Sequence, residues 1–181
     1  MKLAMLIAQG FEISEALVTL DVLRRANITT DLISIDTHIN KTSSHHVTLT
    51  CDYLLEDVNM ETYSGIILPG GMPGTAHLEE NDNVIYWLNQ FNKQGKYLFA
   101  ICAAPSILVK LGFLDHQSYT CYPGFHEKDS KAHYLDKEKV VVSNRIITAK
   151  AMGASLDFGL KIIEKLLNIE EAEKVKKSVF Y

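Results

Sequence analysis

The sequence predicts a single α/β domain in which a mainly parallel sheet is covered by helices on both faces. Short apolar runs alternate with longer segments whose apolar residues recur at helical spacing. The chain has 181 residues, of which 47% are hydrophobic. A chain of this length and hydrophobic content can form one core but is short for two domains of ordinary size. We therefore expect residues 1–181 to form one doubly wound domain.

The individual elements follow from where the apolar period changes. A run of β-type apolar residues that is too short for a helix is typical of a strand buried on both faces. The expected strands are residues 2–8, 30–35, 47–50, 64–68, 97–101, 118–122, 140–143 and 145–148, with the last two paired as a hairpin around Asn144. The expected helices are residues 13–25, 84–93, 105–111, 156–167 and 170–179.

Composition excludes several classes of partner. The formal net charge is −4 and the basic residues are scattered, which argues against a nucleic-acid or anionic-membrane surface. No apolar run is long enough to span a bilayer, and no leader pattern opens the sequence, so we expect a cytoplasmic protein. Three cysteines at unmatched spacings are expected to be free thiols.

Cys102 stands where the strand at 97–101 passes into a helix that has Pro105 in its first turn. Free backbone N–H groups and the helix dipole at such a position favour a thiolate. The alternative is an inert buried cysteine, the more common role of this residue type. Catalytic groups in parallel sheets gather at the carboxyl ends of strands, so we favour a reactive Cys102.

Two further segments follow strands at the same edge of the sheet. Residues 69–74 read Pro-Gly-Gly-Met-Pro-Gly, which allows close backbone approach but matches no phosphate-binding signature. Glu15 lies in the first turn of the first helix, where an acid also suits the dipole. His45 and His46 are adjacent, so they are poor co-ligands for a metal, and we expect a loop there, with no metal and no cofactor.

The chain resembles the ThiJ/PfpI superfamily and its DJ-one branch. The residues that carry the resemblance are Glu15, the Leu-Pro-Gly-Gly run that ends at Gly71, and the segment around Cys102. The likeness covers nearly the whole length. It implies a flavodoxin-like sandwich, a homodimer, and a nucleophilic, readily oxidised cysteine. By the same resemblance Cys102 is the reactive cysteine, Glu15 the acid beside it, and Gly71 and Ala103 the backbone donors of an anion pocket. A thiolate and a carboxylate repel each other, so we expect this pair to share one proton, with a protonated Glu15 donating to the sulfur.

Other positions are implied as pocket or interface residues, some with departures from the family pattern. Gly70 and Gly153 fall on the rim, where Ala151-Met152-Gly153 replaces Gly-Pro-Gly. Tyr122 stands where many members have a histidine, and His126 is near it at a different offset. Arg25 matches an arginine that faces the partner subunit in family members. His45 is the best match to a second such arginine.

Two functions from different classes remain open. One is a cysteine enzyme that acts on small reactive carbonyls or their early glycated adducts, as in the conversion of methylglyoxal to lactate. The other is an oxidative-stress sensor or chaperone in which Cys102 becomes a sulfinate. A glutamine amidotransferase would need glycines flanking the cysteine and a late His-x-Glu, and the sequence has neither.

Overall fold

The computed structural model describes all residues, 1–181, as one α/β domain built on a seven-stranded sheet. The strand order is β10-β11-β7-β6-β1-β2-β5, and every pair is parallel except β10 with β11. The strands of this sheet are β1 (Lys2–Ile7), β2 (Thr29–Ser34), β5 (Tyr53–Leu54), β6 (Gly65–Leu68), β7 (Tyr97–Ile101), β10 (Val140–Ser143) and β11 (Ile146–Ala149). The expected doubly wound fold is confirmed.

Two short ladders lie outside the main sheet. They pair β3 (Asn40–Thr42) with β4 (Thr48–Thr50), and β8 (Ser118–Tyr119) with β9 (His133–Tyr134). The expected strand at 118–122 is therefore shorter and does not join the central sheet. His45 and His46 lie in the turn of the β3–β4 hairpin, as expected for a loop.

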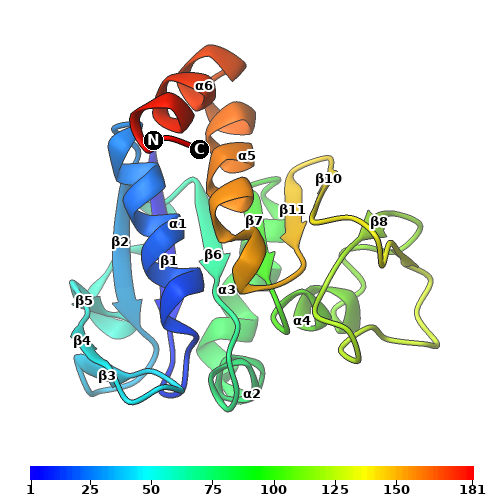
Figure 1. The fold of residues 1–181 in the computed structure, drawn as a ribbon. Coiled ribbons are helices and arrows are strands. Elements are labelled where there is room, and N and C mark those ends of the chain that lie inside the picture. Colours follow the sequence, from blue (N-terminus) through cyan, green and yellow to red (C-terminus); the bar gives the residue numbers. More distant parts are fainter.

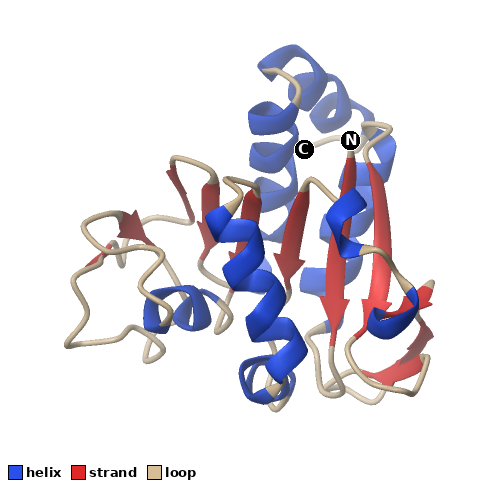
Figure 2. Ribbon diagram, turned by 180° about the vertical axis from the view of Figure 1, so that it is seen from behind, coloured by secondary structure: helices blue, strands red, loops and turns tan.

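Helices cover both faces of the sheet (Figures 1 and 2). One layer contains α1 (Ile13–Arg25), α5 (Ser155–Leu166) and α6 (Ile169–Ser178), and the other contains α2 (Gly74–Glu80), α3 (Asp82–Lys93) and α4 (Pro105–Lys110). Alternate residues of β1 supply the two cores: Leu3 and Met5 face the α1 side, while Ala4 and Leu6 face the α3 side. Short 3₁₀ turns at residues 55–57, 60–62 and 152–154 complete the chain.

The helix α2 was not expected from the sequence. Its apolar pattern is sparse, and only Gly74, Thr75 and Leu78 are buried. No helix of the protein combines the length and hydropathy that a bilayer crossing requires.

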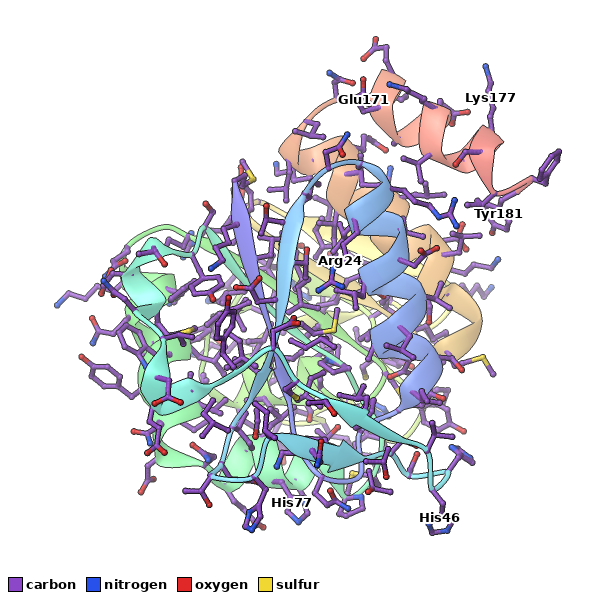
Figure 3. The ribbon with its side chains drawn as sticks, turned by 90° about the vertical axis from the view of Figure 1, so that its left-hand side faces the viewer. Arg24, His46, His77, Glu171, Lys177 and Tyr181 are labelled. Atoms are coloured by element: carbon purple, nitrogen blue, oxygen red, sulfur yellow. The ribbon has the colours of Figure 1, made fainter.

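The carboxyl ends of the parallel strands meet at one end of the molecule. In Figure 1 the arrows of β2, β6 and β7 point to the end where α2 and α4 lie, and in Figure 3 His46 and His77 mark that end, opposite α6. β1 is the turning point of the topology, because β2 lies on one side of it and β6 on the other. Ligand sites in open α/β sheets form at such a point.

Candidate active site

Cys102 occupies a sharp elbow between β7 and α4. Its φ is +65°, in the left-handed region that non-glycine residues rarely adopt. Two hydrogen bonds hold its backbone there: Cys102 N–H donates to the carbonyl of Ala149 at 2.9 Å, and Tyr122 N–H donates to the carbonyl of Cys102 at 2.7 Å. The half-buried thiol is thereby presented at the edge of the sheet.

Glu15 reaches the same point from α1. The residue is 1% exposed, although it lies only one turn from the helix start. The Glu12 side chain caps that turn by accepting from the Glu15 N–H at 2.6 Å. The Glu15 carboxyl accepts from the N–H of Gly70 at 2.9 Å, and the Cys102 side chain and the Met152 N–H lie near enough to lower its pKa. An ordinary solvated first-turn glutamate is therefore the wrong description of this residue.

Neighbouring atoms leave no room for a side chain at Gly70 and Gly71, the two glycines after β6. A Cβ on Gly70 would lie 2.6 Å from the Cys102 Cβ and 2.7 Å from Glu15 Oε2. Gly71 has φ +93°, and a Cβ there would lie 2.4 Å from the Glu12 N. Only glycine lets this loop pass between the acid and the thiol.

Two backbone donors face the sulfur. The N–H groups of Gly71 and Ala103 both lie near enough to the Cys102 side chain to lower the pKa of its thiol. Neither is donated to a backbone carbonyl. They converge on one point from two different loops, which is the arrangement that stabilises an oxyanion. The residues expected to form the anion pocket therefore lie together around Cys102.

The acid and the thiol titrate as a pair. Burial raises the pKa of the Glu15 carboxyl to about 7, against the hydrogen bonds from Cys102 and Gly70. Burial, and then the Glu15 charge, raise the pKa of the Cys102 thiol to about 12, while the N–H groups of Ala103 and Gly71 lower it. Between about pH 7 and pH 12 the pair therefore holds one proton between its two groups.

This outcome differs from the expectation that the helix N-terminus alone would favour a thiolate. α4 has only six residues, so its dipole is small, and burial beside a carboxylate outweighs it. A thiolate forms here when Glu15 carries the shared proton. The electrostatics of Cys102 therefore depend on Glu15 more than on α4.

The remaining expected residues lie farther out. The Tyr122 ring is exposed and packs edge-on against Phe125 at 6.2 Å, so only its backbone supports Cys102. His126 stacks on the Tyr134 ring at 4.7 Å and lines a neighbouring cavity. Gly153 lies in the 3₁₀ turn beside Met152, where a Cβ would meet nothing within 4 Å.

Arg25 and His45 make only local contacts within one chain. Arg25 pairs with Asp21 at 2.7 Å on the exposed face of α1, and the His45 ring bonds the neighbouring Ser44 hydroxyl. Their expected role at a partner's site stays a prediction. The neighbouring Arg24, labelled in Figure 3, bonds the carbonyl of Thr30 and the carboxylate of Asp52.

The sequence placed Met152 on the rim as part of the Ala151-Met152-Gly153 run but did not indicate its approach to Glu15. Its N–H reaches the Glu15 carboxyl from the loop after β11. The available signal was positional, because this loop also follows the carboxyl end of a parallel strand, next to β7. No group of three His, Cys, Asp or Glu side chains is arranged to hold a metal ion.

Comparison with known proteins assigns the family. A model of the DJ-1/PfpI family matches residues 1–165. The chain belongs to the DJ-1/PfpI family. It is 33% identical over 165 residues to the glutathione-independent glyoxalase DJR-1.2 of Caenorhabditis elegans, with 90% of this chain and 87% of that protein covered.

Other members extend the comparison. Toxoplasma gondii DJ-1, in a structure described as oxidized, superimposes with a TM-score of 0.91 at 32% identity, covering 99% of this chain and 98% of that one. The chain is 30% and 31% identical to the DJ-1 homologues B and A of Arabidopsis thaliana, with 93% of this chain covered in each case. It spans only 39% and 44% of their length.

The raised pKa of Glu15 predicts a specific pH dependence of stability. An acid whose pKa rises from 4.5 to about 7 on folding stabilises the fold below pH 4.5 and loses that contribution as the pH rises to 7. Relative to Glu15→Gln, the wild type should lose up to about 3 kcal/mol of unfolding free energy across this window. Urea denaturation at several pH values measures it.

Glu15→Leu serves as a second variant for this prediction. It also lacks the titrating group, so its unfolding free energy should follow the pH course of Glu15→Gln whatever its absolute stability. Wild-type and variant curves that run parallel from pH 4.5 to 7 would contradict the assignment.

Cys102 is predicted to be the first thiol to oxidise. Cys51 and Cys121 are 4% and 0% exposed, whereas Cys102 is partly accessible and faces two N–H groups that would bind sulfinate oxygens. Peptide mass spectrometry after mild peroxide treatment should find oxygen added at Cys102 alone. Cys102→Ser is the control, and earlier oxidation of either buried thiol would overturn the prediction.

Proposed function

We propose that this protein is a cysteine-dependent enzyme that acts on small reactive dicarbonyl compounds and converts methylglyoxal to lactate without a cofactor. The observation that carries the proposal is the proton-sharing pair of Cys102 and Glu15 beside the free N–H groups of Gly71 and Ala103. The name of the Caenorhabditis elegans relative supports the choice of substrate.

The chemistry needs only these groups and water. The Cys102 sulfur adds to the aldehyde carbon, and the N–H groups of Gly71 and Ala103 hold the oxygen that gains charge. Glu15 then takes the proton from that carbon and returns one to the neighbouring carbon, which turns the hemithioacetal into a lactoyl thioester. Water hydrolyses the thioester and restores the thiol, so methylglyoxal plus water gives lactate with no net oxidation.

Early adducts of the same carbonyls offer a related substrate. A hemithioacetal or hemiaminal reverts to the free dicarbonyl and its thiol or amine, and Cys102 would then add to the released aldehyde. A free dicarbonyl is the simpler substrate, because it needs no room for a protein side chain around the half-buried sulfur.

A second candidate is a redox sensor or redox-regulated chaperone. The N–H groups of Gly71 and Ala103 would bind a Cys102 sulfinate as they would an oxyanion. The Toxoplasma gondii relative described as oxidized favours keeping this candidate. Turnover of methylglyoxal separates the two.

The Glu15→Gln variant gives the sharpest test of catalysis. Glutamine keeps a donor for the sulfur but cannot transfer a proton, so lactate formation should fall about a hundredfold or more while Cys102 still titrates as a reactive thiol. An enzymatic lactate assay and a thiol-reactivity titration measure the two effects. Cys102→Ser should abolish turnover.

The outcome also ranks the candidates. If Glu15→Gln forms lactate at the wild-type rate, Glu15 is a structural partner only. If the wild type forms no lactate, the sensor candidate replaces the enzyme.

We also propose a homodimer that joins through the exposed face of α1. Leu17 and Val18 are 38% and 36% exposed on the helix that carries Asp21 and Arg25. Met152, whose N–H lies near the Glu15 carboxyl of the same helix, is 55% exposed and adds apolar surface at the rim of the site. A partner at this face would cover that surface.

Light scattering at micromolar concentration tests the dimer. The wild type should give twice the chain mass, and the double variant L17E/V18E should give a monomer because it places charges in the interface. Tyr86→Glu is the matched control, since Tyr86 is 54% exposed on α3 at the other face of the sheet. A monomeric wild type would remove Arg25 and His45 from the site.

A further inference from the structure

Glu12 caps the helix that carries Glu15. Its backbone is extended (φ −87°, ψ 120°), so the helical turn begins after it, and its carboxylate oxygen Oε2 accepts from the Glu15 N–H at 2.6 Å. Serine, threonine, aspartate and asparagine are the usual residues at this position, where a side-chain oxygen accepts from a free N–H group of the first turn. A glutamate there brings a second carboxyl group within one turn of Glu15.

The same turn of α1 holds both backbone groups of one residue in the loop after β6. The Glu12 N–H donates to the carbonyl of Gly70 at 2.8 Å, and the Glu15 carboxyl accepts from the N–H of Gly70 at 2.9 Å. A Cβ on Gly71 would lie 2.4 Å from the Glu12 N, so the next residue of the loop packs directly on this turn. The first turn of α1 therefore sets the position of the Gly71 N–H as well as that of the Glu15 carboxyl.

The segment that leads into Glu12 is held by the β3–β4 hairpin. Ser44 N–H donates to the carbonyl of Phe11, the residue before Glu12, at 2.9 Å. The titratable side chain that follows Ser44 in this hairpin is His45, and its ring bonds the Ser44 hydroxyl. Glu12 therefore enters α1 from a backbone that is already anchored.

Two titratable groups act on the Glu15 carboxyl: Cys102 from the β7–α4 elbow, and Glu12 from its own helix. The loops after β6 and β11 present the N–H groups of Gly70 and Met152 to it. A neighbouring negative charge favours the protonated form of an acid, and the charge of Glu12 acts on Glu15 in this direction. Glu12 is half-buried, so salt screens its charge less than that of a surface acid.

We propose that Glu12 is a positioning residue of the candidate site. Its carboxylate holds the Glu15 carboxyl against Cys102, and its negative charge lies beside the pair that shares one proton. Through Gly70 it also fixes the N–H donor of the next residue. Its effect on the Cys102 thiol holds for any substrate, whereas its effect on lactate formation rests on the proposed function.

The pH dependence of alkylation at Cys102 in the full-length protein tests the charge. Iodoacetamide reacts with the thiolate, so its rate in the wild type should rise around a midpoint near the pKa of about 7 that burial gives Glu15. Glu12→Gln keeps an acceptor for the Glu15 N–H but removes the charge, so the midpoint should shift to lower pH. Peptide mass spectrometry assigns the modification to Cys102. An unchanged midpoint, or a shift to higher pH, would overturn the proposal.

Two further variants separate the hydrogen bond of Glu12 from its charge. Glu12→Ala loses both, so its midpoint should shift as in Glu12→Gln. Its lactate formation at the high-pH plateau should be about tenfold lower than that of Glu12→Gln, because small misplacements of a reacting group are costly in rate. Glu12→Asp keeps both and should restore the wild-type midpoint. Equal lactate rates in Glu12→Ala and Glu12→Gln would contradict the positioning role. If the wild type forms no lactate, the proposed function fails, and the alkylation profiles still decide the role of Glu12.

Matched controls remove a helix cap or an acidic charge elsewhere. Asn168 caps α6 by accepting from the Glu171 N–H at 2.9 Å, at the end of the molecule opposite the site (Figure 3). Asn168→Ala therefore removes the same kind of cap, and Glu170→Gln removes one charge from the first turn of that helix. Both variants should keep the wild-type midpoint. A shift in either that equals the shift in Glu12→Gln would indicate a general effect of stability or net charge and would overturn the proposal.

Discussion

One proton held between a buried carboxyl and a buried thiol is the constraint on which the candidate site depends. Glu15 and Cys102 each lose solvent on folding, and each would repel the other if both were ionised. The protein keeps them together by surrounding them with N–H donors from Gly70, Gly71 and Ala103. The result is a pair whose single negative charge can move between oxygen and sulfur, as a nucleophile with its own proton carrier requires.

The backbone around this pair is held in conformations that would be unfavourable alone. Cys102 adopts a positive φ, at a cost of about 1 kcal/mol or more. Gly71 does so without that cost because it has no side chain. Bonds from Cys102 N–H to Ala149 and from Tyr122 N–H to Cys102 make the elbow an extension of the sheet. The rigid sheet thus fixes the direction in which the Cys102 side chain points.

The sequence by itself determined the alternation of strands and helices, the position of Cys102 at a strand end, and the need for glycine after β6, because these follow from local periodicity and sterics. It did not show that Gly70 and Glu15, 55 residues apart, would share a hydrogen bond. It also indicated a thiolate from the helix terminus, whereas burial decides the pKa of Cys102. Burial and the Met152 contact depend on residues remote in the chain, so only the tertiary structure decided them.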